Sequence, residues 1–131
     1  MIDLATLTGS CIRTLGNLAG GLFSNDDTLA NGILKACDET GERLWRLPLW
    51  DDYKNYIKSD VADVKNFSGK PSAGAITAAK FLEHFTNNHP CWAHMDIAGV
   101  AVMDSEYSRQ KSATGFGVRL LLEYLSEIGN E

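Results

Sequence analysis

The sequence predicts an α/β fold in which a layered sheet is flanked by helices, and three observations predict it. Short apolar runs, typical of buried strands, occur at residues 2–7 and 91–97. Apolar residues with helical spacing occur between these runs and after the second one. The two kinds of segment alternate along 131 residues, which is the length of one domain or of one continuous piece of a larger domain.

Extended segments are expected at four places in the chain. The run at 2–7 ends in the polar sequence Thr8-Gly9-Ser10, which predicts a strand followed by a loop. A short strand is expected around Leu22-Phe23, and 44–49 is expected to be extended because Pro48 disfavours helix for the residue before it. The run at 91–97 predicts the second clear strand, which ends in the segment 98–101.

Helices are expected where apolar residues recur every three or four positions. Asn25 or Asp26 can cap a helix that Gly41 ends, and its apolar stripe is Leu29, Ile33, Leu34 and Cys37. A second helix opens near Ala73, with the stripe Ala78, Phe81, Leu82 and Phe85. The last helix ends at Gly129, with the stripe Val118, Leu121, Leu122, Leu125 and Ile128. A short helix is expected at 50–57, which would bury Trp50, Tyr53 and Ile57, and the polar segment 59–72 is the longest expected loop.

Composition and charge exclude several classes of partner. Hydrophobic residues make up 44% of the chain and charged residues 22%, as in an ordinary soluble globular domain. The net charge of −5 and the absence of a basic run disfavour a nucleic-acid partner, because phosphate binding needs a basic surface. No apolar run reaches the roughly 18 residues that a membrane helix needs, and the first residues lack the pattern of a signal peptide. A cytoplasmic chain with three reduced, mostly buried cysteines is therefore expected.

Two glycine-containing motifs do not meet the requirements of nucleotide-binding loops. A phosphate loop needs Gly five residues before its Lys and Ser or Thr directly after it, whereas Lys65 and Pro71 stand at those places around Lys70. Gly115-Phe116-Gly117 lacks the third glycine of a dinucleotide-binding turn and does not follow an expected strand. Neither motif indicates a phosphate site.

His94 and Asp96 are the strongest chemical candidates that the residues suggest by themselves. Alternation along a strand places both side chains on one face, where a metal ion or a proton relay could use them. A zinc site takes three or four ligands, so two are too few. The favoured interpretation is a structural or supporting pair, because buried His and Asp side chains are usually hydrogen-bonded within the core.

Seven blocks of this sequence, taken in order, resemble the leucyl (cytosol) aminopeptidases. The first is Ile2-Asp3-Leu4-Ala5-Thr6-Leu7-Thr8-Gly9 and the sixth is Trp92-Ala93-His94-Met95-Asp96-Ile97-Ala98-Gly99. The other five lie at 21–27, 44–49, 59–63, 74–79 and 113–119. One block would be a weak signal, but seven in order over nearly the whole chain are specific. The resemblance implies the fold of the C-terminal portion of that family's catalytic domain.

The resemblance also implies a cytoplasmic exopeptidase that uses two zinc or manganese ions to remove the amino-terminal residue of peptides, with leucine-type, broad specificity. The family holds the metals with Lys and Asp residues and with the Asp-x-Glu pair of Asn-Thr-Asp-Ala-Glu-Gly-Arg, all of which would precede this chain. The only Asp-x-Glu here, 104–106, does not match that motif. Residues 1–131 are thus expected to be an incomplete catalytic domain without catalytic residues, metal ligands or bound metal, inactive alone, from a parent that forms homohexamers.

What this chain would contribute is the wall of the substrate pocket. By resemblance, the Leu7 carbonyl and the Gly9 amide are backbone partners of the substrate, and Thr6 lies beside the side-chain pocket. Ala98 and Ala101 match positions that line the pocket for the amino-terminal side chain. At these positions packing is the alternative role, since small and apolar residues at strand ends usually serve the core.

Asn66 and Phe67 match positions near the leaving side of the substrate. The family usually has Asn-Ile-Gly at this point, whereas this chain has Asn66-Phe67-Ser68. The shape of this part of the pocket is therefore expected to differ from the family pattern.

Three functional hypotheses follow. The first is a portion of a peptidase, and the second is a non-catalytic scaffold or oligomerisation module derived from the same family. The third is an independent enzyme that uses His94, Asp96 or a cysteine. An exposed apolar face is expected where the missing segment of the domain would pack, so that the chain self-associates or is marginally stable.

Overall fold

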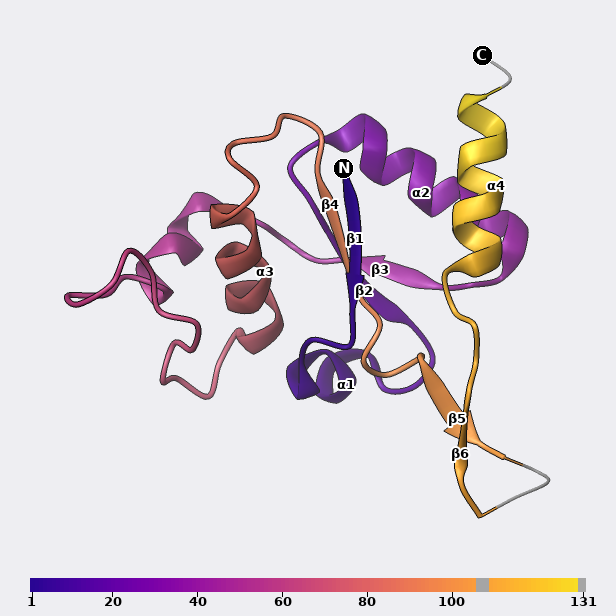
Figure 1. Cartoon of the computed structure of the whole chain (residues 1–131), viewed down its shortest axis with the longest axis horizontal. Coiled ribbons are helices and arrows are strands. Elements are labelled where there is room, and N and C mark those ends of the chain that lie inside the picture. Colours follow the sequence, from indigo (N-terminus) through magenta and orange to yellow (C-terminus); the bar gives the residue numbers. More distant parts are fainter. Residues whose placement is uncertain (106–108, 130–131) are drawn as a thin grey trace.

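The computed structural model describes residues 1–105 and 109–129. Its main sheet has the strand order β1-β4-β2-β3 (Figure 1). The strands are β1 (Ile2–Ala5), β2 (Gly20–Ser24), β3 (Leu44–Arg46) and β4 (Ala93–Asp96). β4 runs parallel to β1 and antiparallel to β2, and β2 runs parallel to β3, so the sheet is mixed.

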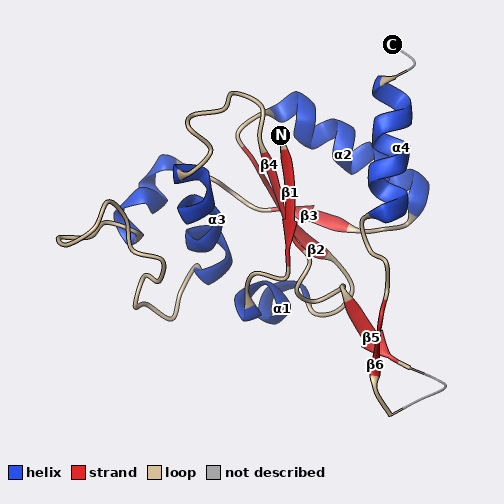
Figure 2. Ribbon diagram, in the orientation of Figure 1, coloured by secondary structure: helices blue, strands red, loops and turns tan. Residues whose placement is uncertain are grey.

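Helices cover both faces of this sheet (Figure 2). They are α1 (Gly9–Leu15), α2 (Asp27–Thr40), α3 (Gly74–His84), α4 (Val118–Ile128) and the 3-10 helix η1 (Asp51–Tyr56). Side chains alternate along β2, so that Leu22 packs with α2 and α4 while Phe23 packs with α1 and α3. The result is the expected layered α/β architecture, with one hydrophobic cluster on each side of the sheet.

The best predicted helix is α2, whose two ends have clear physical causes. The Asp26 carboxylate accepts a hydrogen bond from the Leu29 amide at 2.6 Å, which satisfies one of the free N–H groups of the first turn. At the other end Gly41 has φ +73°, a left-handed conformation that glycine adopts without strain, and its N–H donates to the Cys37 carbonyl. Of the two candidate caps, Asp26 is the one used.

The buried face of α3 differs from the expected apolar stripe. Ala75, Ala79 and Lys80 are buried, whereas Phe85 is 64% exposed. The Lys80 side chain is only 1% exposed and is compensated by Glu83 Oε2 at 2.6 Å and by Asp51 Oδ1 at 3.2 Å. Ala78, Phe81 and Leu82 of the expected stripe are half-buried, so the expected face of α3 is only in part the buried one.

The expected stripe of α4 is likewise mostly on the surface. Leu120 is the buried residue of this helix, and Leu121 and Tyr124 pack partly against the core. Val118, Leu122, Leu125 and Ile128 are 50–68% exposed. The sequence thus identified the apolar residues of α4, but these four form an outward-facing surface, of the kind expected for a face that packs against another part of an assembly.

Two further local expectations were wrong. A small antiparallel hairpin, β5 (Val102–Asp104) with β6 (Lys111–Ala113), lies in a region for which no strand was expected. Its residues are all exposed, so no buried face produced an alternating pattern. The helix expected at 50–57 is the 3-10 helix η1, and Trp50 next to it is 65% exposed rather than buried.

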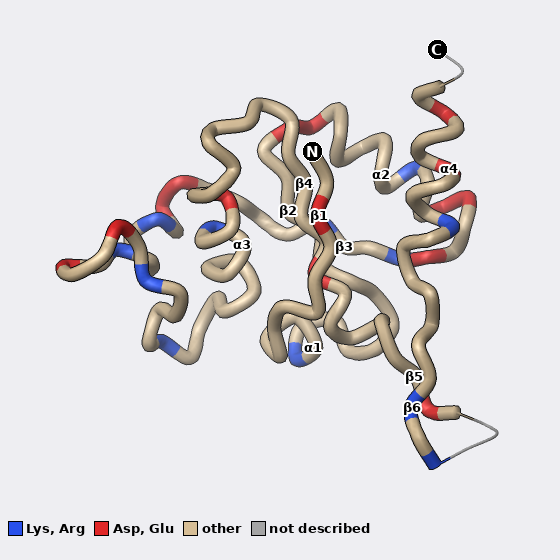
Figure 3. Tube along the Cα trace, viewed as in Figure 1, with Lys and Arg blue, Asp and Glu red and all other residues tan. Residues whose placement is uncertain are grey.

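Two properties bear on the partners considered from the sequence. Within the described residues, no helix has the length and apolarity needed to span a membrane. Figure 3 shows basic and acidic residues at many places along the trace, both of them in the projecting segment between η1 and α3.

Candidate functional site

Two loops leave the same edge of the sheet at the ends of β1 and β4. Residues 6–8 connect β1 to α1, and residues 97–101 follow β4. Because β1 and β4 are parallel, their carboxyl ends coincide, and the Ile97 amide donates to the Ala5 carbonyl at 2.9 Å. In open α/β sheets this edge is where ligands usually bind.

The carboxylate of Asp96 joins these two loops. Asp96 is fully buried, and its Oδ1 accepts hydrogen bonds from the amides of Leu7 at 3.1 Å, Thr8 at 3.4 Å and Ala98 at 3.2 Å. Its Oδ2 accepts a hydrogen bond from the Thr8 hydroxyl at 2.7 Å. One side chain therefore holds the loop after β1 against the loop after β4.

Thr8 extends this network into α1. It is the N-cap residue of the helix, and its Oγ1 accepts a hydrogen bond from the Cys11 amide at 3.0 Å. The same hydroxyl group donates a hydrogen bond to Asp96 Oδ2, so it contacts both the start of α1 and the end of β4. The direction in which α1 leaves the sheet is thereby coupled to Asp96.

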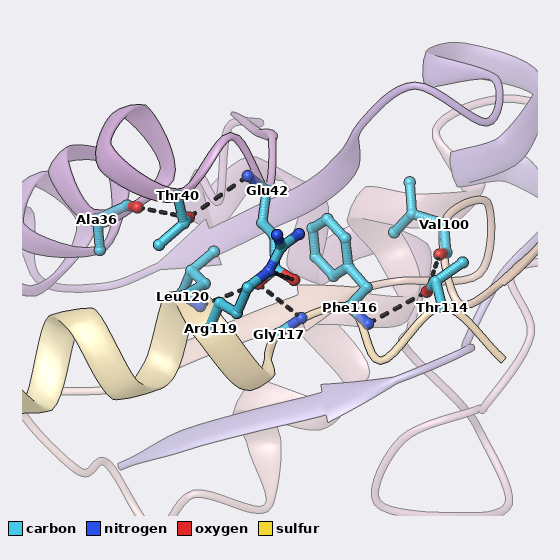
Figure 4. Close-up of polar contacts among 9 residues, drawn as sticks. All are labelled: Ala36, Thr40, Glu42, Val100, Thr114, Phe116, Gly117, Arg119 and Leu120. Carbon is cyan, nitrogen blue, oxygen red and sulfur yellow. Dashed lines mark hydrogen bonds and ion pairs between the residues drawn. The ribbon is translucent and has the colours of Figure 1, made fainter.

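The loop after β4 is held from its other side by Thr114 (Figure 4). The Thr114 hydroxyl donates to the Val100 carbonyl at 2.6 Å, and the Thr114 amide donates to the Ala101 carbonyl at 3.0 Å. Gly99 lies so close to the Gly16 carbonyl that an added Cβ would stand 2.2 Å from that oxygen. Only glycine allows this close approach without a backbone shift.

Glu42 anchors the segment that follows Thr114 (Figure 4). Its buried carboxylate accepts hydrogen bonds from the Gly117 amide at 3.1 Å and the Leu120 amide at 2.9 Å. Gly117, the N-cap of α4, has no side chain to make this cap, so a residue distant in sequence supplies it. Arg119 Nε lies 3.4 Å from the same carboxylate at the surface.

The structure brings five of the seven predicted substrate residues to this edge. Thr6, Leu7 and Gly9 lie in or directly after the β1–α1 loop and are exposed. Ala98 and Ala101 lie in the neighbouring loop and are half-buried, and the Leu7 and Ala98 amides meet at the same Asp96 oxygen. The grouping was expected from the resemblance, while a contact with substrate remains a prediction.

Asn66 and Phe67 lie elsewhere in this chain. They belong to the projecting segment between η1 and α3, which Figure 1 places on the side of α3 away from β1. Both are exposed, and Phe67 is 74% exposed. No contact among the described residues joins these two residues to the loops around Asp96.

His94 and Asp96 serve different partners despite sharing a strand face. His94 Nδ1 lies 2.5 Å from Asp3 Oδ1, and the Trp92 indole donates to Asp3 Oδ2 at 2.7 Å. His94 is fully buried between neighbouring rings, with Phe23 stacked at 5.9 Å between centroids. His94 therefore joins β4 to β1 while Asp96 joins two loops, and the connection of Asp96 to the loop after β1 was not foreseen from the sequence.

The described residues do not form a metal centre. Across residues 1–105 and 109–129, no three His, Cys, Asp or Glu side chains come close enough to hold an ion together. Glu106, part of the Asp-x-Glu triplet noted in the sequence, lies outside the described residues. Within the described chain, the metals implied by the resemblance therefore find no matching donor set.

The cysteines are free thiols, two of which burial makes unreactive. Burial raises the pKa of Cys11 and of Cys37 to about 11 in each case. Cys91 is half-buried rather than buried as expected from the apolar residue next to it. A thiol with a raised pKa holds little thiolate at neutral pH, so Cys11 and Cys37 are poor candidates for a nucleophile.

Comparison with known proteins gives a consistent result. The cytosol aminopeptidase family, catalytic domain, matches residues 1–122. A probable cytosol aminopeptidase from Chlorobaculum tepidum is 60% identical over 125 residues, covering 95% of this chain and 25% of that protein. One from Roseiflexus castenholzii is 53% identical over 129 residues, covering 97% and 26%.

Solved structures agree with this result. The bottromycin maturation enzyme BotP superposes with a TM-score of 0.89 at 38% identity, covering 99% of this chain and 29% of that one. A mutant of tomato leucine aminopeptidase gives 0.86 at 40% identity, covering 96% and 24%.

The fold and these matches relate the chain to the aminopeptidases. It belongs to the cytosol aminopeptidase family, and the matched region is part of the catalytic domain. The chain spans about a quarter of the length of the curated relatives it matches.

Proposed function

We propose that residues 1–131 form one side of the substrate cleft of an aminopeptidase that releases amino-terminal residues, leucine and similar ones, from peptides. The observation that carries the proposal is the meeting of the loops after β1 and β4 at Asp96. Family membership supports it, since the matched region belongs to a catalytic domain. In this proposal the chain is an incomplete C-terminal portion of that domain.

Each predicted site residue has a simple task in this cleft. The Leu7 carbonyl accepts a hydrogen bond from a backbone N–H of the substrate. The Gly9 amide donates one to a backbone carbonyl of the substrate. The small side chains of Ala98 and Ala101 leave room for the amino-terminal side chain, with Thr6 beside it. The exposed Asn66 and Phe67 contact the leaving side once the remaining parts of the domain close the cleft.

The metal ions of the proposed enzyme are held outside this chain. Cytosol aminopeptidases are metal-dependent, and we propose two divalent ions, zinc or manganese. Such ions polarise a scissile carbonyl and activate a water molecule. Since the described residues provide no donor set for them, this chain is assigned substrate binding only, and we expect it to be inactive alone.

The cellular setting proposed for the whole protein is the cytoplasm, where it would act as a homohexamer on peptides. The cytosolic setting is supported by the names of the relatives. An assembly is supported by the exposed apolar residues of α4, because an exposed apolar surface of this kind usually packs against another protein surface. The number of subunits comes from the resemblance.

A chimera tests the proposal directly. Residues 1–125 replace the matching quarter of the Chlorobaculum tepidum relative, and hydrolysis of leucine anilide is measured with manganese or zinc. We expect the chimera to turn over the substrate and to lose activity with a chelator, with the unmodified relative as control. Chelator-sensitive turnover by residues 1–131 alone, or a folded but inactive chimera beside an active relative, would contradict the proposal.

A scaffold without a catalytic contribution is the second candidate function, and the exposed face of α4 favours it. This function predicts a folded, inactive chimera whose assembly size depends on α4. Replacing Leu122 and Leu125 with Ser and measuring the mass in solution distinguishes the two candidates. If this variant of the chimera no longer assembles but each folded molecule keeps full turnover, the chain contributes to catalysis and a role in assembly alone is contradicted.

A further inference from the structure

Asp96 carries a buried charge at the rim of the proposed cleft. Burying a carboxylate is costly unless strong hydrogen bonds compensate it. Here the compensation comes from three backbone amides and one hydroxyl, and all four donors lie in the two loops that flank the cleft. Asp96 therefore contacts the parts of the chain that would hold substrate.

The direction of one peptide unit shows what this carboxylate does. The Thr8 N–H and the Leu7 C=O belong to the same trans peptide unit, in which the two groups point in opposite directions. Because the Thr8 amide and the neighbouring Leu7 amide both point at Asp96 Oδ1, the Leu7 carbonyl is aimed away from it. Within the described chain, no hydrogen bond engages that carbonyl.

The donor beside this carbonyl is positioned by the same residue. Thr8 caps α1, and its hydroxyl is held by Asp96 Oδ2. Gly9 is the first residue of α1, so its N–H has no acceptor within the helix. An outward carbonyl and a free amide two residues apart form the acceptor and donor pair that an extended peptide backbone needs.

We propose that Asp96 is a positioning residue for substrate binding: it orients the Leu7 carbonyl and the Gly9 amide and ties them to the wall at Ala98. The inference rests on the proposed function, since the ligand is the peptide substrate of that cleft. Asp96 itself is buried and does not touch the substrate.

The test uses variants of the active chimera described above. In Asp96→Ala all four hydrogen bonds are lost, and we expect kcat/KM to fall about 10- to 100-fold, mostly through KM, since small misplacements of binding groups have effects of that size. In Asp96→Asn the amide oxygen still accepts from the three backbone amides, so kcat/KM recovers to within about 3-fold of the unmodified chimera. The matched control is Asp38→Ala, an exposed carboxylate on α2, which leaves both constants unchanged.

A structural role alone predicts a different pattern, in which Asp96→Ala lowers the yield or the melting temperature while the folded molecules keep their KM. That result would overturn the proposal. If Asp96→Ala does not fold, Thr8→Val decides, because it removes the hydroxyl bond to Oδ2 and the capping bond from the Cys11 amide, and leaves the bonds from the Leu7, Thr8 and Ala98 amides to Oδ1. We expect its KM to rise about 5-fold, on the scale of the lost hydroxyl bonds, and an unchanged KM would contradict the inference.

Amide hydrogen exchange in residues 1–131 separates this inference from the proposed function. We expect the amides of Leu7, Thr8 and Ala98 to lose protection in Asp96→Ala and to keep it in Asp38→Ala. If the unmodified chimera is inactive, the proposed function fails and the role in substrate binding fails with it. Unchanged protection in a folded Asp96→Ala chain would refute the positioning of the loop, whether or not the chimera is active.

Discussion

Removing the Glu42 side chain is expected to release the start of α4 and to destabilise the chain strongly. In Glu42→Ala the amides of Gly117 and Leu120 lose an acceptor that now lies 3.1 and 2.9 Å away. Both amides are buried, and leaving a buried donor unsatisfied costs about 1–3 kcal/mol. The loss at two such amides lowers the free energy of unfolding by about 2–6 kcal/mol, a large part of the total stability of a domain.

Two further variants separate the hydrogen bonds from the charge. Glu42→Gln keeps one acceptor oxygen for the two amides but loses the favourable charge at a helix N-terminus, so a loss of about 1 kcal/mol is expected. Arg119→Ala removes an ion pair whose guanidinium is 72% exposed, so its cost stays below about 0.5 kcal/mol. The matched control is Glu39→Ala, an exposed carboxylate in the last turn of α2, three residues before Glu42.

The assay is urea unfolding of the 131-residue chain, followed by circular dichroism at a wavelength that reports helix. The expected order of stability is control, Arg119→Ala, Glu42→Gln and then Glu42→Ala. A Glu42→Ala chain within about 0.5 kcal/mol of the control would refute the cap, because exposed substitutions alone stay in that range. A larger loss in Arg119→Ala than in Glu42→Ala would refute it as well.

Two other predictions concern buried groups outside the cleft. At pH 8 a thiol with a pKa of about 11, as for Cys11 and Cys37, is ionised in about one molecule in a thousand. A thiol reagent should therefore label Cys91 first and reach Cys11 and Cys37 only on unfolding. Rapid labelling of Cys11 or Cys37 in the folded chain would contradict the raised pKa. Glu83→Gln should lower the free energy of unfolding by about 1–3 kcal/mol, more than Lys80→Met, because it removes the negative charge 2.6 Å from the buried ammonium and leaves the more distant Asp51 as its ionic partner, whereas Met removes the buried charge itself; equal losses in urea unfolding would argue against this.

The sequence predicted the elements that have strong local signals. β1 and β4 are short apolar runs, and α2 has both a capping aspartate and a terminal glycine. The buried faces of the amphipathic helices α3 and α4 were harder to predict. On α3 the buried Lys80 reverses the polarity of one face, and α4 exposes apolar residues that a periodicity rule assigns to the core.

The grouping of five of the seven candidate positions at one edge of the sheet was predictable, while the hydrogen bonds that organise it were not. The resemblance pointed to Leu7 and Ala98, which the structure places at one carboxylate. Asp96 was visible only as half of a strand pair with His94, because a hydrogen bond between residues 88 or 89 positions apart leaves no local pattern. The same holds for Glu42, whose partners lie 75 and 78 residues further along the chain.

The most direct test of the cleft is a crystal structure of the chimera with a non-hydrolysable leucine dipeptide analogue bound. The account predicts that the backbone of the analogue lies within hydrogen-bonding distance of the Leu7 carbonyl oxygen and the Gly9 nitrogen, with its first side chain against Ala98 and Ala101. It also predicts that every metal ligand comes from the relative's part of the chimera. An analogue bound away from the loops after β1 and β4, or a metal ion ligated by residues 1–125, would contradict the account.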